Sequence, residues 1–223
     1  MNFVYISPNF PDAAWKFCAA LKSNGVNVLG IGDQPYDELK PELKAALTEY
    51  YKVSTLENYD EVYRGVAHFA WKHGRIDWLE SNNEYWLEQD ARLRTDFNIT
   101  TGIKSDSINT IKEKSEMKKY YSLGGIRTAR QIKAEEGPEV AKRFAKDAGF
   151  PLFAKPDVGV GSNGTYKIEN EADLEAFFKD NSDYAHYVIE EYVTGDICDY
   201  DAIIDSQGRP IFESMSVCPP SIA

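Results

Sequence analysis

The sequence predicts an α/β protein with a parallel sheet in its N-terminal part and a mixed α+β part after it. Predicted strands and helices alternate over residues 1–98, and helices and strand pairs follow in mixed order from about residue 103. Hydrophobic residues make up 43% of the 223-residue chain, which is enough for a core in one large or two small domains. Alternation of this kind indicates parallel strands that are joined by right-handed crossovers.

Four short apolar runs are the expected strands of the N-terminal part. They cover residues 3–7, 26–31, 51–54 and 76–80. Apolar runs of this length, bounded by turn residues, are typical of strands in a parallel sheet that is buried on both faces. We therefore expect a Rossmann-like arrangement over this part of the chain.

Four helices are expected to alternate with these strands. The first follows Asp12, which can cap it, and ends at Asn24 and Gly25. The others are expected at residues 41–50, 58–73 and 84–94. The segment 81–84 follows the fourth strand, at the carboxyl end where α/β sheets usually bind ligands. It can contribute to an acceptor site, although capping of the next helix is the simpler interpretation.

The second part of the chain is expected to place two helices on an antiparallel sheet. A flexible connection at residues 99–102 leads to a helix that begins near Lys114 and ends at Gly124 and Gly125. Further helices are expected at 138–148 and 172–178. The expected strands cover residues 151–155, 165–168, 187–193, 199–205 and 210–217, with a hairpin turn at 206–208 between the last two.

The most informative segment is a strand, a glycine-rich loop and a second strand over residues 151–168. Gly159, Gly161 and Gly164 match the spacing G-x-G-x-x-G, but a dinucleotide site needs a helix after the loop, and residues 165–168 favour a strand. Glycine allows positive φ and close approach of backbone N–H groups to oxygen, which suits a loop that covers phosphates. Lys155, at the end of the first strand, can reach a phosphate; the alternative is a surface lysine beside an ordinary hairpin.

A second signature lies at residues 187–196, where an apolar strand carries two adjacent carboxylates. Glu190 and Glu191 follow Val188 and Ile189, and a glycine and an acid come shortly after. Such a strand can present backbone groups and carboxylates to a nucleoside. The two segments together indicate a nucleotide site.

These motifs resemble those of the ATP-grasp superfamily. Lys155 and the loop that contains Gly159, Gly161, Ser162, Asn163 and Gly164 resemble its second ATP-contacting lysine and its phosphate flap. Upstream, Lys114 resembles the first nucleotide-contacting lysine of the family. A shift of the match by two residues would give Lys112 this position instead.

The strand at 187–193 resembles the strand of that family that binds adenine. By this resemblance Glu190 and Glu191 lie beside the adenine amino group, and Val193 supplies a backbone N–H. Asp196 is similar to the ribose-binding acid, although the family usually has Glu there.

The resemblance also implies a division into domains. A Rossmann-like pre-ATP-grasp domain is expected at 1–100 and a partial ATP-grasp domain at 101–223. The second comprises a linker helix at 103–123, a lid subdomain at about 126–193 and the start of the large ATP-binding subdomain at 194–223. In the family an acidic residue and a Glu-x-Asn pair on later strands bind Mg²⁺. We expect these ligands beyond residue 223, so the chain is interpreted as a fragment with no metal ligand or catalytic residue assigned.

The resemblance implies an ATP-dependent carboxylate–amine or related ligase that acts through an acyl phosphate. Its partners would be ATP, Mg²⁺ and a small carboxylate substrate, and a homodimer stays open. Among such enzymes the spacing is most similar to the carbamoyl-phosphate synthase large subunit. We expect no ligase turnover from these 223 residues alone. The alternatives are a non-catalytic nucleotide-binding regulatory module and an α/β binding protein with a chance glycine hairpin.

Composition limits the other classes of function. The formal net charge of −11 disfavours nonspecific binding of nucleic acid, which depends on Lys and Arg. The sequence contains no apolar run of about 18 residues, so no membrane span is predicted. The N-terminus does not resemble a signal peptide, and a cytoplasmic protein is therefore expected. The three cysteines include no C-x-x-C pair, which argues against a zinc site or a disulfide framework.

Two further groups of metal-binding residue types have simpler interpretations. His68 and His73 are five residues apart, which does not place both on one helix face. Asp199, Asp201 and Asp205 alternate along a predicted strand and can share a face. A solvated strand face is favoured there over a magnesium site.

Overall fold

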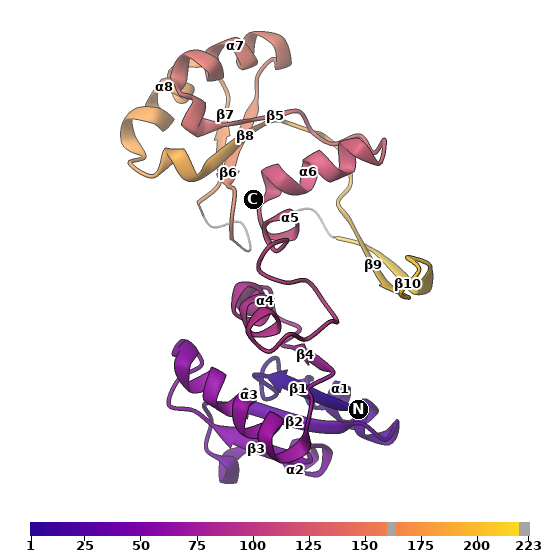
Figure 1. Cartoon of the computed structure of the whole chain (residues 1–223). Helices are drawn as coiled ribbons and strands as arrows, with labels where there is room; N and C mark the ends of the chain where they lie inside the picture. The colour runs from indigo at the N-terminus through magenta and orange to yellow at the C-terminus, as the bar shows by residue number, and fades with distance from the viewer. Residues whose placement is uncertain (160–163, 219–223) are drawn as a thin grey trace. The chain divides into compact units, whose positions relative to one another are not determined.

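The protein is described by a computed structural model that covers residues 1–159 and 164–218. The chain divides into two compact units, Met1–Met117 and Lys118–Ala223, and each is described by itself (Figure 1). Within the described residues, every helix is too short or too polar to cross a membrane.

The first unit contains a four-stranded parallel sheet. Its strands are β1 (Asn2–Ile6), β2 (Asn27–Gly32), β3 (Glu49–Lys52) and β4 (Trp78–Glu80), in the order β3-β2-β1-β4. Each neighbouring pair is parallel, as the alternation of elements predicts. The connections from β1 to β3 extend the sheet in one direction, and β4 joins the opposite side of β1.

Helices cover both faces of this sheet. They are α1 (Trp15–Ser23), α2 (Pro41–Ala46), α3 (Tyr59–His73) and α4 (Leu87–Asp96), followed by the short α5 (Asn109–Lys112). Val4 and Ile6 of β1 pack with residues of α3 and α4, whereas Tyr5 between them packs with residues of α1 and α2. Alternation along the strand therefore supplies a separate hydrophobic core on each face. Short 3₁₀ helices lie at Tyr36–Glu38 and Glu84–Trp86.

Two helix ends of the first unit differ from the prediction, and the strand predicted at 51–54 begins at Glu49 and ends at Lys52. The helix expected at 41–50 ends at Ala46, because Leu47 has an extended backbone (φ −77°, ψ 147°) and the tyrosines that follow belong to β3. Asp12 does not cap α1; its carboxylate forms an ion pair with Lys40, and the N-cap residue is Ala14. Tyr50 and Tyr51 favour a strand, so a helical pattern that continues through them is misleading.

The second unit contains a four-stranded antiparallel sheet with two helices on one face, as predicted. The strands are β5 (Gln131–Lys133), β6 (Leu152–Pro156), β7 (Tyr166–Ile168) and β8 (Tyr187–Glu191), in the order β5-β8-β6-β7. Helices α7 (Pro138–Ala148) and α8 (Glu171–Asp180) lie beside this sheet in Figure 1. Their buried side chains share a core with those of β6, β7 and β8. Strand β5 was not predicted. Helix α6 (Lys114–Leu123) spans the division between the units, and 3₁₀ helices lie at Ala134–Glu136 and Tyr184–His186.

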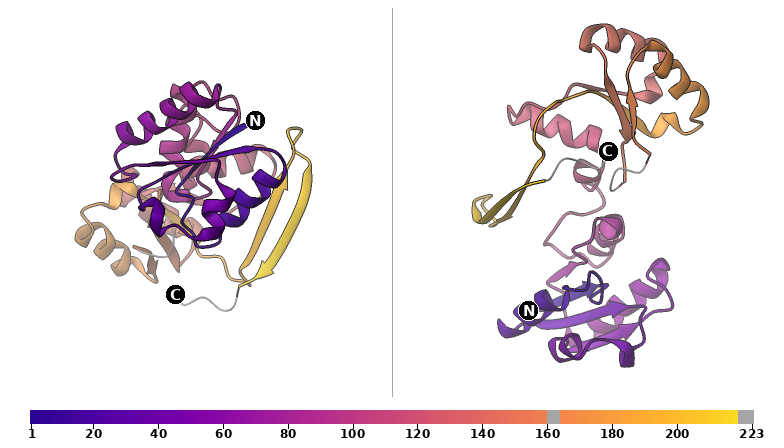
Figure 2. Two further views of the ribbon diagram at one scale, coloured as in Figure 1. Left: turned by 90° about the horizontal axis from the view of Figure 1, so that it is seen from below. Right: turned by 180° about the vertical axis from the view of Figure 1, so that it is seen from behind.

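A two-stranded antiparallel ribbon, visible in Figure 2, follows this sheet. It consists of β9 (Cys198–Ile204) and β10 (Pro210–Val217), and every residue of both strands is exposed. The predicted turn is present, since the N–H of Gly208 donates to the carbonyl oxygen of Asp205 over 3.0 Å. Asp199 and Asp201 are solvated on β9, and no group of three or more His, Cys, Asp or Glu side chains could hold a metal ion within 1–159 and 164–218. Cys18, Cys198 and Cys218 are free thiols.

Candidate functional site

The sheet of the second unit has one face that packs against α7 and α8 and one that does not. On β6, Leu152 and Ala154 belong to the core under α7 and α8, as does Ile189 on β8. Side chains alternate along a strand, so Lys155 of β6 and Glu190 of β8 lie on the other face. The predicted lysine and the first predicted carboxylate are therefore brought together on the same side of one sheet.

Glu190 binds two lysines, and we call Lys118, Lys155 and Glu190 the lysine–glutamate cluster. The ammonium of Lys155 lies 2.8 Å from Oε2 of Glu190, and that of Lys118 lies 2.6 Å from Oε1. Lys118 also donates to the carbonyl oxygen of Ala129 over 2.8 Å. The Glu190 side chain is only 8% exposed, whereas that of Lys155 is 26% exposed.

The cluster has one positive charge in excess, because two ammonium groups face one carboxylate. A buried carboxylate is costly unless it is paired, and here each of its oxygens has a cationic partner. Lys155 is the more exposed of the two lysines, so its ammonium can exchange Glu190 for another anion while Lys118 still pairs with Glu190. These residues fit a phosphate group at Lys155.

Glu191 points away from this cluster and is held by Arg130. The backbone N–H of Arg130 donates to Oε1 of Glu191 over 2.9 Å, and its guanidinium donates to Oε2 over 2.7 Å. These bonds to the charged form hold the pKa of the Glu191 carboxyl below its usual range. The two adjacent carboxylates therefore have different environments, and only Glu190 contacts Lys155.

The loop between β6 and β7 lies partly outside the described residues. Gly159 has φ +131° and Gly164 has φ +74°, both in the region that favours glycine. A Cβ atom on Gly164 would lie 3.0 Å from the hydroxyl of Tyr187, so this position also requires a small residue. Gly161, Ser162 and Asn163 lie outside the described residues, and their predicted contacts with phosphate stay a prediction.

The remaining predicted residues lie at element ends or in connections. The predicted strand at 187–193 is shorter, since β8 ends at Glu191, and Val193 and Asp196 lie in the exposed connection to β9. Lys114 is the first residue of α6 and falls in the first unit, whereas Lys155 falls in the second. The alternative, Lys112, forms an ion pair with Glu88 over 2.7 Å. The structure does not decide between Lys114 and Lys112, and Lys114 stays the first candidate from the sequence.

Two residues that pair with the predicted carboxylates were missed in the sequence. Lys118 follows Lys114 by four residues, which places both on one face of α6, and this spacing could have identified it. Arg130 stands directly before β5, and nothing in its local sequence indicates that it pairs with Glu191, 61 residues later.

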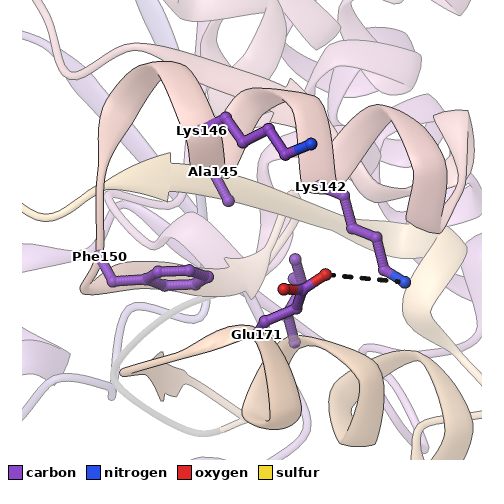
Figure 3. Close-up of a pocket in the computed structure, with 6 residues that line it drawn as sticks. Lys142, Ala145, Lys146, Phe150 and Glu171 are labelled. Atoms are coloured by element: carbon purple, nitrogen blue, oxygen red, sulfur yellow. Dashed lines mark ion pairs between the residues drawn. The ribbon is translucent and has the colours of Figure 1, made fainter.

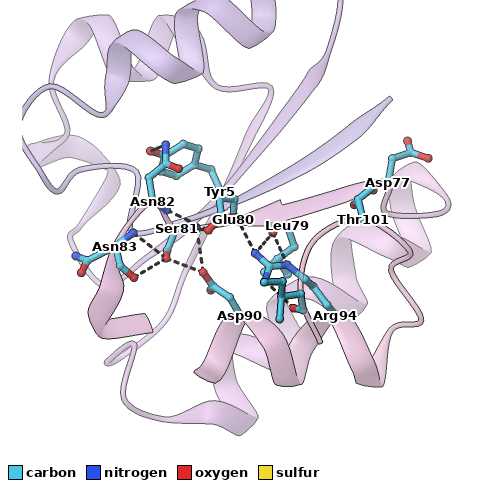
Figure 4. A network of polar contacts seen from close by, with 11 residues as sticks. Tyr5, Asp77, Leu79, Glu80, Ser81, Asn82, Asn83, Asp90, Arg94 and Thr101 are labelled. Atoms are coloured by element: carbon cyan, nitrogen blue, oxygen red, sulfur yellow. Dashed lines mark hydrogen bonds and ion pairs between the residues drawn. The ribbon is translucent and has the colours of Figure 1, made fainter. Parts of the chain in front are cut away.

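The polar segment after β4 is held by a buried network in the first unit (Figure 4). Asp90 accepts hydrogen bonds from the Ser81 hydroxyl over 2.6 Å and from the Ser81 N–H over 3.1 Å. Arg94, also buried, donates twice to the carbonyl oxygen of Leu79. Asn83 accepts from the N–H of Tyr85 over 3.0 Å, so the segment caps the next helical turn, as the simpler interpretation predicted.

The two histidines of α3 meet at one carboxylate, a contact that their spacing alone did not predict. Nε2 of His68 lies 2.9 Å from Oε1 of Glu49, and Nε2 of His73 lies 2.7 Å from Oε2. Lys72 lies 3.0 Å from the same carboxylate. Burial raises the pKa of Glu49, but these three partners outweigh it and lower the pKa to about 2. The side chains converge because Glu49 lies between them, although the histidines do not share one helix face.

Comparison with known proteins gives partial matches. No family model matches the chain. It is 25% identical over 125 residues to the carbamoyl phosphate synthase large chain of Methanothrix thermoacetophila. The aligned region covers 54% of this chain and 12% of that protein. It is 31% identical over 106 residues to a D-alanine–D-alanine ligase of Clostridium perfringens, which covers 44% of this chain and 33% of the ligase.

A solved structure matches most of the chain. The biotin carboxylase domain of Hydrogenobacter thermophilus 2-oxoglutarate carboxylase, in complex with MgADP and bicarbonate, superposes with a TM-score of 0.70 at 20% identity. The match covers 89% of this chain and 46% of that domain. The chain therefore spans half or less of each protein compared above. The sequence matches and the shared fold together indicate the ATP-grasp superfamily, in agreement with the resemblance of the motifs.

Proposed function

We propose that this chain binds ATP as part of an ATP-dependent carboxylate–amine or related ligase. The observation that carries the proposal is Lys155, which lies on the face of the β5-β8-β6-β7 sheet opposite α7 and α8, with its ammonium against the doubly paired Glu190. The excess positive charge of the cluster favours a phosphate there. The domain limits predicted from the sequence, 1–100 and 101–223, belong to this proposal.

The chemistry proposed is phosphoryl transfer to a small carboxylate, after which a nucleophile such as an amine attacks the acyl phosphate. Proteins accelerate such transfers mainly by positioning and by neutralising charge. In this proposal Lys155 and Lys114 neutralise phosphate charge, and the loop from Gly159 to Gly164 covers it. The adenine lies near Glu190, Glu191 and Val193, and the ribose near Asp196. Mg²⁺, when bound, would add positive charge at the phosphates; its protein ligands are not assigned.

The experiment that tests this proposal measures binding of Mg-ATP and of adenosine by titration calorimetry. Replacing Lys155 with alanine is expected to weaken ATP binding by one to two orders of magnitude, from the loss of a charge-assisted contact of roughly 1.5–3 kcal/mol. Adenosine lacks the phosphates, so its affinity is expected to change much less. This comparison separates a role at the phosphates from a general loss of the site.

A matched control is available on α8. Lys179 is exposed and has no ion pair or hydrogen bond within residues 1–159 and 164–218, so Lys179→Ala removes the same charge elsewhere in the unit. It is expected to leave ATP binding unchanged. Equal ATP affinity in the wild type and Lys155→Ala would remove Lys155 from the site.

The non-catalytic binding module remains the second candidate, and a turnover assay separates the two. A ligase releases ADP only when a carboxylate substrate is present, whereas a binding module holds nucleotide without such release. Carboxylate-dependent ADP release from this chain, or from a longer product of its reading frame, would therefore favour the ligase. ATP binding without release in the longer product would favour the module.

A further inference from the structure

A cavity of about 230 Å³ lies between α7 and α8, on the side of the β5-β8-β6-β7 sheet that these two helices cover (Figure 3). Its lining consists of Lys142, Ala145, Lys146, Phe150, Glu171 and Leu174. Ala145 and Leu174 belong to the core that also contains Leu152 and Ala154. Lys155 and Glu190 lie on the other face of the sheet, so this cavity is separate from the proposed nucleotide site.

The floor and one wall of the cavity are apolar. Ala145 is 6% exposed and Leu174 is 1% exposed, and the aromatic ring of Phe150, which is 39% exposed, forms a side wall. Pockets for drug-sized ligands have volumes of about 300–1,000 Å³, so a ligand of this cavity is smaller. A short branched hydrocarbon group would fit the apolar part.

Charges of both signs stand around this apolar part. Lys146 has no ion pair or hydrogen bond in the described part of the chain. Glu171 has only a long contact of 4.0 Å with Lys142, because Lys142 makes its closer ion pair, of 2.8 Å, with Glu175, one turn further along α8. Figure 3 shows the Glu171 carboxylate between Phe150 and Lys142. One cation and one anion at the cavity are therefore available to a ligand.

From these observations we propose that the cavity binds a free amino acid with a mid-sized aliphatic side chain. The carboxylate of the ligand pairs with Lys146, its ammonium pairs with Glu171, and its side chain packs on Ala145, Leu174 and Phe150. A ligand with only an anionic group would face Glu171 without a partner for that carboxylate. A ligand with only a cationic group would be repelled by the positive charges of Lys142 and Lys146.

The test compares four small molecules by residue-resolved NMR titration of the full chain. L-leucine carries both charges and an aliphatic group; 4-methylpentanoate lacks the ammonium, isopentylamine lacks the carboxylate, and glycine lacks the hydrocarbon. Leucine at a concentration on the order of 10 mM, tenfold above a millimolar dissociation constant, is expected to shift the amide signals of Ala145, Lys146, Phe150 and Leu174. Each of the other three is expected to bind at least about tenfold more weakly, since each loses one charge-assisted or apolar contact.

Variants locate the binding. Lys146→Met and Glu171→Gln keep the size of each side chain and remove its charge, and each is expected to weaken leucine binding by about tenfold or more. Lys179→Met, on the same pair of helices but outside the cavity, is the matched control and is expected to bind as the wild type does. Lys146 and Glu171 are exposed, so their replacement is not expected to unfold the protein and obscure the result.

Three outcomes would overturn the proposal. Leucine that causes no shift at the cavity residues would exclude binding there. A carboxylate or amine analogue that binds as tightly as leucine would exclude a zwitterion as the ligand. Unchanged leucine affinity in both Lys146→Met and Glu171→Gln would place any binding elsewhere, including at an acceptor site of the proposed ligase. Because Lys155 takes no part, Lys155→Ala is expected to bind leucine normally whether or not the chain binds ATP.

Discussion

Asp90 is a fully buried carboxyl group that holds the segment after β4. Its Oδ2 atom accepts both hydrogen bonds from Ser81, and its Oδ1 atom has no hydrogen-bond partner among the described residues. Arg94 is close by but pairs with Glu80 instead, over 2.7 Å. Burial raises the pKa of Asp90 to about 7, in spite of the opposing effect of the Ser81 bonds.

This pKa makes the stability of the first unit depend on pH. Between about pH 4 and 7 the folded state keeps a proton on Asp90 that the unfolded state has released, so the free energy of unfolding falls as the pH rises. We expect Asp90→Asn, which keeps an acceptor for Ser81 and does not ionise, to lack this dependence. Relative to the variant, the wild type is expected to lose on the order of 2 kcal/mol between pH 5 and pH 8.

Urea unfolding followed by tryptophan fluorescence measures this difference. Trp15, Trp71, Trp78 and Trp86, the four tryptophans of the chain, all lie in the first unit, which also contains Asp90. The same pH dependence in the wild type and the variant would show that Asp90 is ionised in the folded state at pH 5. A control at Asp60, an exposed acid on the first turn of α3, is expected to keep the wild-type slope.

At the scale of single residues, the sequence predicted where a residue lies in its strand or helix better than it predicted which side chains that residue contacts. The position of Lys155 at a strand end followed from the local pattern. The pairing of Glu190 with Lys118 joins residues 72 positions apart in the chain, and no local pattern carries that information. Glu49, for the same reason, could not be foreseen as the carboxylate that joins His68 and His73.

At the scale of elements, the long periodic segments were predictable and the short ones were not. Helix α3 has an Asn58 cap, a 15-residue amphipathic pattern and Gly74 at its end, and it was predicted nearly to the residue. Strand β5 has only three residues and no clear alternation, and its hydrogen-bonded partner β8 defines it. Short strands of this kind form because a neighbouring strand satisfies their backbone groups, which a local pattern does not reveal.

Helix α8 depends on its N-terminal cap. The side chain of Asn170 accepts a hydrogen bond from the N–H of Asp173 over 3.0 Å and leaves fewer unsatisfied groups in the first turn. We expect Asn170→Ala to lower the stability of the second unit by about 1 kcal/mol. Far-UV circular dichroism during urea unfolding measures this loss, and Asn170→Asp, which keeps an acceptor, should restore most of it. An alanine variant as stable as the wild type would contradict a role for the cap.

At the scale of the whole molecule, the chain consists of two units that each have their own hydrophobic core. The parallel sheet of the first unit has a core on each face, and the antiparallel sheet of the second unit has one core under α7 and α8. Units with separate cores can unfold separately. The position of the tryptophans allows the first unit to be followed without a signal from the second.

A core substitution in the second unit tests whether the units unfold separately. Ile189→Ala removes a fully buried side chain and is expected to destabilise the second unit by about 3 kcal/mol. The urea transition seen by far-UV circular dichroism should then split or broaden, while the transition seen by tryptophan fluorescence stays in place. A fluorescence transition that moves together with the dichroism transition would indicate one cooperative unit instead.

The alternation along β8 has a consequence for how its length can change in evolution. Ile189 and Glu190 are neighbours in sequence but lie on opposite faces of the sheet, one in hydrocarbon and the other between two ammonium groups. Inserting or deleting one residue ahead of them would exchange the two environments, with a carboxylate under the helices and an isoleucine against the lysines. Descendants of this chain should therefore tolerate many substitutions along the strand, while changes of length should be confined to the turns at its two ends.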